Sequence, residues 1–305
     1  MRRPPAFTAP LLASLLATVA LGACSSTPVA RESPPATPPT VVAAATTHAD
    51  DNLNAVLWVQ RSAEYRAAAE TVYRAATARL DAALKDPAWD ALVPEERANA
   101  ARGLPPAVVM DIDETVLDNS PYQARLVRDG AEYDEVTWDA WVREQRAKPV
   151  PGVVEFARVA QAKGVTVIYI SNRAEHLIEP TLANLRAVGL PVKDDSVFLG
   201  LGTHVPDCEQ EGSEKLCRRQ FAGRSYRVLM QFGDQLGDFA QILANTPEAR
   251  DALQAQYRDW FGERWWMLPN PTYGSWEPAV FNNNWREPRE ARREAKRNAL
   301  DMASP

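Results

Sequence analysis

The carboxylates best suited to chemistry in this chain are Asp111 and Asp113, which directly follow the apolar run Val108–Met110. Short apolar runs are typical of buried strands in a parallel sheet. Open α/β sheets bind ligands beyond the carboxyl ends of such strands, so both side chains are expected at a ligand site. Two like charges so close together are unfavourable unless a cation neutralises them or one carboxyl takes up a proton. The pair therefore suits phosphoryl transfer assisted by a hard metal ion.

Three further polar groups stand in a similar context. Ser171-Asn172-Arg173 follows the apolar run Val165–Ile170, and Gly233-Asp234-x-x-x-Asp238 closes the run Arg227–Phe232. Lys215 stands at the start of a predicted helix. Each signal is weak alone, because such residues also occur in ordinary turns and helix entries. Together with the two aspartates, in this order, they predict a single site.

The elements that must position these groups alternate between strand and helix patterns. This order predicts an α/β fold, a three-layer Rossmann-like parallel sheet with helices on both faces. The polar and aromatic insertion 117–150 follows the first strand of the site and is predicted to form a small, mainly helical cap. The predicted strands are Ala107–Met110, Val165–Ile170, Ser196–Leu199, Arg227–Phe232 and Trp265–Leu268.

Helices are predicted at both ends of this domain, which is expected to span residues 50–305. Apolar residues recur at helical spacing from Tyr65 to Ala83, so one N-terminal helix is expected over 50–85. The run Arg286–Asn298 mixes Arg, Lys and Glu at i,i+4 spacing, which predicts a solvated helix.

The first 23 residues predict a signal peptide. A basic head precedes the apolar stretch Leu11–Leu21, which is too short to span a bilayer as a stable helix. The segment Leu21–Ser25 resembles the lipobox of bacterial lipoproteins, which predicts cleavage before Cys24 and a lipid anchor on this residue. Ordinary secretory cleavage nearby is the alternative. Residues 24–49 predict a disordered tether, and we expect an exported lipoprotein of the bacterial outer membrane.

Two cysteines remain after Cys24. Export would place them in an oxidising compartment, where disulfides persist. A disulfide between Cys208 and Cys217 is the simplest expectation, and two free buried thiols are the alternative.

The charge balance argues against several classes of function. A net charge of −6 and a pI near 5.3 give no general attraction to nucleic-acid polymers or anionic membranes. A small anionic substrate therefore needs local positive groups. His176 and His204 are too few and too scattered for a zinc or histidine-phosphatase site.

The motifs in this order resemble those of the haloacid dehalogenase superfamily, and more narrowly those of the class C, lipoprotein-type bacterial acid phosphatases. The resemblance covers nearly all of the chain beyond the tether. Gln235 stands where the family often has Asn, which bears on substrate choice. The resemblance implies an Mg²⁺-dependent acid phosphatase that hydrolyses phosphomonoesters, 5′-nucleotides included. Besides the lipobox, it rests on Ser62–Tyr65, Asp111–Ser120, Tyr169–Arg173, Lys215-x-x-Arg218-Arg219 and Pro269–Trp276.

The resemblance also implies a role for each site residue. Asp111 is the expected nucleophile, which forms an aspartyl-phosphate, and Asp113 is the expected general acid and base. One Mg²⁺ is expected on the carboxylates of Asp111 and Asp234 and the backbone carbonyl of Asp113. Asp238 is expected to order a metal-bound water or Lys215. The residues expected to bind the phosphate are Thr115, Ser171, Asn172 and Lys215.

Several neighbouring residues admit two interpretations. Trp141 and Tyr273 are expected either to stack on a base or aryl group of the substrate or to pack in the core. Arg173 is expected either in a surface salt bridge or on the pocket wall. For Asp118 and Asn119, a turn is favoured over a direct role.

Two other functions fit the same scaffold, a phosphotransferase and a non-catalytic binding lipoprotein. The presence of all four residues of the expected chemistry counts against the second, namely Asp111, Asp113, Lys215 and Asp234. The expected partners are a small phosphomonoester and, through a lipid on Cys24, a membrane. The sequence leaves formation of a homodimer open.

Overall fold

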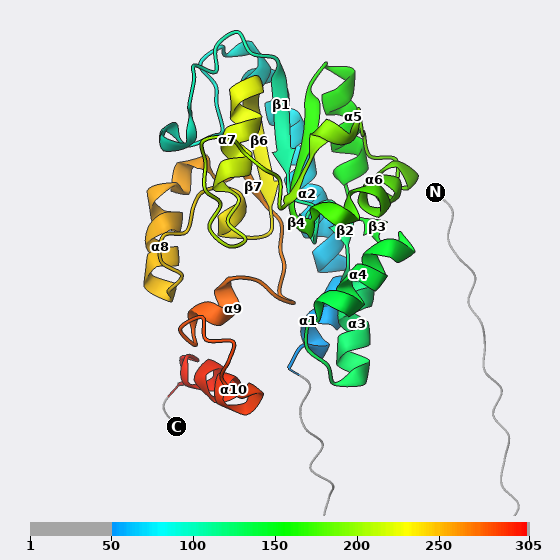
Figure 1. The fold of residues 1–305 in the computed structure, drawn as a ribbon, viewed down its shortest axis with the longest axis vertical. Helices are drawn as coiled ribbons and strands as arrows, with labels where there is room; N and C mark the ends of the chain where they lie inside the picture. The colour runs from blue at the N-terminus through cyan, green and yellow to red at the C-terminus, as the bar shows by residue number, and fades with distance from the viewer. Residues whose placement is uncertain (1–50, 304–305) are drawn as a thin grey trace, which may run out of the picture. The chain divides into compact units, whose positions relative to one another are not determined.

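The computed structural model describes residues 51–303 (Figure 1). The predicted signal peptide, the lipid site at Cys24 and the predicted tether lie outside these residues. No helix of the described part is long and apolar enough to cross a membrane.

The centre of the domain is a parallel sheet of five strands, which are β1 (Pro106–Met110), β4 (Thr166–Ala174), β5 (Phe198–Leu201), β6 (Arg227–Gly233) and β7 (Trp265–Met267). Their order is β5-β4-β1-β6-β7, so β1 lies in the middle (Figure 1). Val109 of β1 pairs with Ile168 on one side and with Gln231 on the other. Each predicted strand is present. Because parallel strands end at the same edge, the residues that follow β1, β4 and β6 become neighbours.

Each face of the sheet has its own hydrophobic core. Successive side chains of a strand point to opposite faces. Accordingly, Val108 and Met110 pack in one core, and Ala107 and Val109 pack in the other. Helices cover both faces, which confirms the predicted three-layer α/β fold. The first core includes residues of α2 (Ala63–Lys85), α5 (Val153–Ala162) and α6 (Ile178–Ala187), and the second includes a residue of α7 (Leu216–Ser225).

The segment predicted as one helix over 50–85 forms two helices, α1 (Leu53–Arg61) and α2. The break is at Ser62, whose φ of −74° and ψ of 144° are extended. The Ser62 hydroxyl accepts a hydrogen bond from the backbone N–H of Tyr65 at 3.0 Å and so caps α2. This bond competes with the hydrogen bonds of a continuous helix, so the helix breaks at Ser62. The helical spacing of the apolar residues on either side does not indicate such a break.

The insertion 117–150 is a helical hairpin closed at its base by a small antiparallel sheet. The ring of Tyr122 meets that of Trp138 edge-on, with centroids 5.2 Å apart, and so joins its two helices. Its first helix also packs against α1 (Figure 1). The insertion is thus mainly helical, as predicted. Its elements are β2 (Leu117–Asp118), α3 (Ser120–Asp129), α4 (Glu135–Glu144) and β3 (Lys148–Pro149).

The predicted C-terminal helix is α10 (Arg289–Asn298), which begins three residues later than expected. Exposed ion pairs along it, such as Arg297 with Glu290 at 3.0 Å, fit the solvated helix that the charge pattern predicted. The remaining helices are α8 (Pro247–Gln256), α9 (Trp276–Ala279) and the 3₁₀ helices η1 (Pro94–Glu96), η2 (Glu175–Leu177), η3 (Asp195–Val197), η4 (Leu236–Asp238) and η5 (Arg258–Trp260).

Candidate active site

Four carboxylates meet at the carboxyl edge of the sheet. Asp111 and Asp113 follow β1, Asp234 follows β6, and Asp238 ends η4. Carboxylate oxygens of Asp111, Asp234 and Asp238 lie within 4.8 Å of one another, and all three residues are buried. Asp113 lies beside them and is bonded by different side chains, those of Arg173 and Asn119 among them. The separate sequence motifs therefore come together as a cluster of three carboxylates with a fourth beside it.

Lys215, at the start of α7, bridges two of the clustered carboxylates. Its ammonium donates to Asp111 Oδ1 and, at 2.7 Å, to Asp238 Oδ1. Burial alone would lower the pKa of Lys215, but the opposing effect of the two carboxylates is larger. The pKa is therefore raised above its ordinary value, and the ammonium stays charged. The backbone N–H of Gln235 donates to Asp238 Oδ2 at 3.0 Å. A Cβ at Gly233 would overlap the Asp238 side chain, so the close packing of Asp238 against the backbone at position 233 requires glycine.

The cations of the protein do not neutralise the cluster. Burial raises the pKa of Asp111 to about 7, although Lys215 opposes the shift. Burial, together with Asp238 and Asp111, raises the pKa of Asp234 well above its ordinary value. Hard oxygen donors with excess negative charge fit a divalent cation, which would take the place of protons. Asp111 and Asp234 would hold it, and Asn270 orients Asp234 by donating to Oδ2 at 2.7 Å.

A separate network holds Asp113. Arg173 donates to Asp113 Oδ1 through Nε at 3.0 Å and Nη2 at 2.8 Å, and Asn119 Nδ2 donates to the same oxygen at 2.8 Å. Ser171 Oγ donates to Oδ2 at 3.3 Å. Arg173 is buried and lies 5.5 Å from the ring centroid of Trp138, so it is no surface salt bridge but part of the pocket wall. Asp113 is therefore fixed by partners other than those of Asp111.

The predicted phosphate-binding residues differ in their access to this site. Asn172 and Lys215 line the cavity beside the carboxylates. Ser171 is buried, and its hydroxyl reaches Asp113. The Thr115 hydroxyl is buried and lacks a hydrogen-bond partner within residues 51–303. Its role in phosphate binding stays a prediction.

The aromatic residues near the site differ in their access to the cavity. Trp141 is only 3% exposed, packs in the core and donates from Nε1 to Asn119 Oδ1 at 2.8 Å. Of the two interpretations of Trp141, packing in the core is therefore the one that the structure supports, and Trp141 is not among the residues that line the cavity. Trp138, one turn earlier on α4, lines the cavity instead. Tyr273 also lines the cavity, and its hydroxyl donates to Glu114.

The cavity beside the carboxylates has a volume of about 1140 Å³. Its walls come from the sheet edge, the α3–α4 hairpin, the segment 271–278 and α10. This volume exceeds the needs of a phosphate group, so the cavity has room for a large leaving group.

Two residues next to the motif were missed by sequence reasoning. Asn119, for which a turn was favoured over a direct role, is buried and contacts Asp113. Glu114 is buried with a positive φ of 58°, and its Oε1 accepts the backbone N–H of Asn119 at 2.7 Å. Burial raises the pKa of Glu114 to about 8. Their place within Asp111–Ser120 was the only available signal, because the strained turn that joins them is not visible in the sequence.

An Asp-x-Asp motif after the central strand, a lysine and a further aspartate after the neighbouring strand define a hydrolase site of the haloacid dehalogenase (HAD) type. The family model of the acid phosphatases of HAD subfamily IIIB matches residues 11–276. The chain belongs to this family of acid phosphatases and is thus a phosphomonoester hydrolase.

Solved structures agree with this assignment. The chain is similar to the class C acid phosphatase from Bacillus anthracis, with a TM-score of 0.72 and 30% sequence identity over 84% of this chain and 98% of that chain. A structure of the class C acid phosphatase from Bacillus anthracis with tungstate bound also matches, with a TM-score of 0.72, 31% identity and the same coverage. The resemblance recognised in the sequence is confirmed.

The raised pKa of Asp111 predicts a pH dependence of stability. The folded chain holds a proton up to about pH 7 that the unfolded chain releases near 3.8. In chelator-treated protein, this group should stabilise the fold fully below pH 3.8 and lose its effect as pH rises through 7, by up to about 1.4 kcal/mol per pH unit. Mg²⁺ should therefore raise Tm more at pH 7 than at pH 5.

The measurement is thermal unfolding at both pH values, with chelator or with Mg²⁺, of the native protein and Asp111→Asn. Because the variant lacks this titration, Tm of the native protein minus that of the variant isolates the effect. A difference in chelator that grows from pH 5 to pH 7 would contradict the assignment.

Proposed function

We propose that this acid phosphatase hydrolyses phosphomonoesters, 5′-nucleotides among them, through an aspartyl-phosphate on Asp111 with the help of one Mg²⁺. The observation that carries this is the separation of the two motif aspartates. Asp111 lies in the buried carboxylate cluster beside Lys215, whereas Asp113 is held by Arg173 and Ser171. When bound, the cation would screen the phosphate charge from the attacking carboxylate.

The residues of the chain then have distinct tasks. Asp111 attacks phosphorus, and the bond from phosphorus to the leaving oxygen breaks as Asp113 gives that oxygen its proton. Asp113 next takes a proton from water, whose oxygen attacks phosphorus and breaks the bond to Asp111. Lys215 balances charge on the phosphate oxygens throughout. The network around Asp113 supports this exchange because it fixes the carboxyl without burying it fully, leaving its side chain 18% exposed.

Two substitutions of the motif aspartates should separate these tasks. Asp111→Asn should lower hydrolysis of p-nitrophenyl phosphate at least ~10³-fold. Asp113→Asn should lower hydrolysis of alkyl phosphates ~10²-fold or more, because their leaving groups need a proton. With p-nitrophenyl phosphate, Asp113→Asn should release a burst of p-nitrophenolate before slow turnover, since only the second step needs the base.

Steady-state and rapid-mixing assays with Mg²⁺ measure both effects. Asp118→Asn is the matched control, because Asp118 caps the backbone N–H of Ser120 at 2.8 Å and lies outside the carboxylate cluster. Native-like activity of Asp111→Asn would rule out the covalent mechanism. Comparing hydrolysis with transfer to an added alcohol tests the phosphotransferase alternative.

A substrate with an aromatic base fits the wall of the cavity. Tyr273 and Trp138 line it, and its volume admits a nucleoside. Tyr273→Leu should lower kcat/KM for nucleoside monophosphates about tenfold while changing glycerol phosphate hydrolysis less than about threefold. Tyr273→Phe keeps the ring, loses the bond to Glu114 and should retain the preference. An equal loss on both substrates in Tyr273→Leu would argue against stacking.

We also propose that the protein is an exported lipoprotein anchored through Cys24 to the outer membrane. The disulfide Cys208–Cys217 supports export, because such bonds persist in oxidising compartments. Cells that express the native chain should incorporate labelled fatty acid into a membrane-bound protein. Cys24→Ser should abolish the label and release the protein from the membrane fraction. A native protein that is unlabelled and soluble after export would favour ordinary secretory cleavage.

A further inference from the structure

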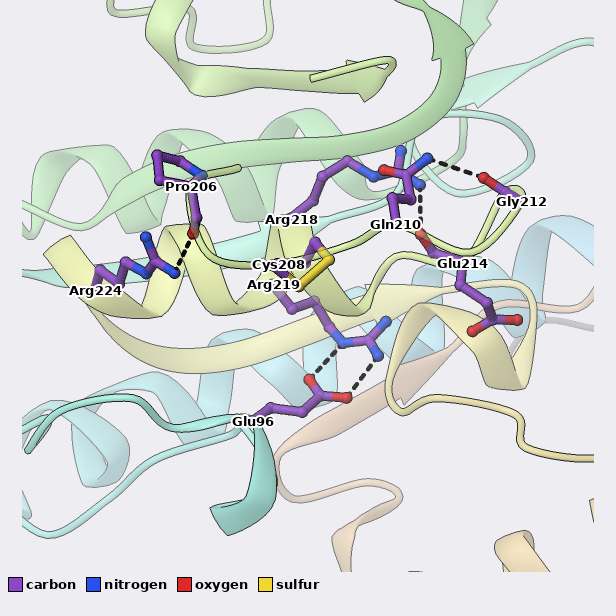
Figure 2. The surroundings of a disulfide bond; sticks show 10 residues. Glu96, Pro206, Cys208, Gln210, Gly212, Glu214, Arg218, Arg219 and Arg224 are labelled. Atoms are coloured by element: carbon purple, nitrogen blue, oxygen red, sulfur yellow. Dashed lines mark hydrogen bonds and ion pairs between the residues drawn. A yellow bond between two sulfur atoms is a disulfide. The ribbon is translucent and has the colours of Figure 1, made fainter. Parts of the chain in front are cut away.

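Two adjacent arginines on α7, Arg218 and Arg219, have 0% exposure, although neither takes part in the proposed chemistry. Burying a guanidinium is costly unless its donors are satisfied. They lie in the first turn of the helix, whose N-cap is Lys215, and Figure 2 shows both side chains. Their hydrogen-bond partners show which parts of the site the two side chains hold in place.

Arg218 joins the end of β4 to the loop before Lys215. Its Nη1 donates to the Ser171 carbonyl at 2.5 Å, and its Nη2 donates to Asn172 Oδ1 at 2.8 Å. Nη2 also lies 3.1 Å from the carbonyl of Glu214, the residue immediately before Lys215. One side chain thus links the carboxyl-terminal part of β4 to the backbone that carries the lysine.

Arg219 fixes the other partner of Lys215. Its Nε and Nη2 form a bidentate pair with Glu96 of η1 at 2.7 and 2.6 Å. Its Nη1 donates to the carbonyl of Gly237 at 2.7 Å. Gly237 immediately precedes Asp238, which accepts from Lys215. Arg219 therefore connects η1, through Gly237, to the carboxylate that orients the lysine.

The disulfide acts on the same turn of α7. Cys208–Cys217 closes a loop that contains Lys215, and Figure 2 shows it beside both arginines. The backbone around Lys215 is thus held by a covalent link and by the guanidinium of Arg218, whereas the guanidinium of Arg219 holds the backbone before Asp238.

We propose that Arg218 and Arg219 are positioning residues, which act through Lys215 by fixing its backbone and its partner Asp238. The inference rests on the proposed function, in which Lys215 balances the charge of the phosphate. A lysine ammonium on a flexible four-carbon stem stabilises developing charge best when its place is set in advance. The bidentate pair and the several carbonyl contacts require guanidinium geometry, so lysine at either position cannot replace arginine.

The test compares Arg218→Lys with Arg227→Lys. Arg227 is also a buried arginine that donates to backbone carbonyls, those of Ala83 at 3.1 Å and Leu84 at 3.1 Å among them, but it lies at the amino end of β6, opposite the site. Both variants should lower Tm. Only Arg218→Lys should lower kcat/KM for p-nitrophenyl phosphate, by about tenfold or more.

A double-mutant cycle shows whether the effect passes through Lys215. In a Lys215→Met background, Arg218→Lys should lower kcat/KM by less than about threefold. Tungstate binding, measured by calorimetry in the same four proteins, should show the same non-additivity. Where Arg218→Lys does not fold, Glu96→Gln enters the cycle in its place and tests the positioning role of Arg219, because the Glu96 carboxylate forms the bidentate pair with Arg219.

An equal loss with and without Lys215, or native kcat/KM in Arg218→Lys, would overturn the inference. These results differ from a failure of the proposed function. If Asp111→Asn stays active, the proposed function is wrong. If Asp111→Asn is inactive but Arg218→Lys keeps native activity, only the positioning role is wrong.

Discussion

The gathering of four carboxylates at one edge of a parallel sheet is the constraint on which the site depends. Neighbouring parallel strands end at the same edge of the sheet, so the residues that follow them lie close together. Three of these carboxylates are buried within 4.8 Å of each other, where like charges repel strongly. The fourth carboxylate, that of Asp113, forms an ion pair with Arg173, whereas Asp111 in the cluster forms one with Lys215. This division of partners gives two chemically similar residues different environments, which is the basis for assigning them different tasks.

The hairpin inserted after β1 does more than cover this edge. Asn119, just after β2, donates to Asp113, and Trp141 in turn donates to Asn119. Trp138 on the same helix as Trp141 covers the guanidinium of Arg173, which also bonds Asp113. The cap and the candidate general acid therefore form one network. A shift of the hairpin relative to the sheet would change the surroundings of Asp113 directly, whereas Asp111 is bonded by Lys215 at the start of α7.

Features set by short stretches of sequence could be predicted, and those set by docking could not. The strand Ala107–Met110 was placed within one residue, because an apolar run before two aspartates is a local signal. The break at Ser62 was missed because a cap bond competes with a helical pattern that continues on both sides. The pattern of α4 did not show which tryptophan faces the cavity, since that depends on how the hairpin packs. Asn172, a partner of Arg218, lies 46 residues away from it, and Glu96, a partner of Arg219, lies 123 residues away, beyond the reach of any motif.

Glu114 shows why burial governs the acidity of this site as much as charge does. Burial and the neighbouring Asp113 raise the pKa of Glu114 to about 8, although the bond from Tyr273 opposes the shift. The carboxyl is thus neutral at acidic pH and adds no further negative charge beside the aspartates. Asp111 shows a similar shift, but it belongs to the cluster where a cation would replace its proton. Glu114 lies outside that cluster, but its charge also raises the pKa of Asp234. The protonation of Glu114 is therefore coupled to that of the aspartates, and a cation on the cluster would influence both.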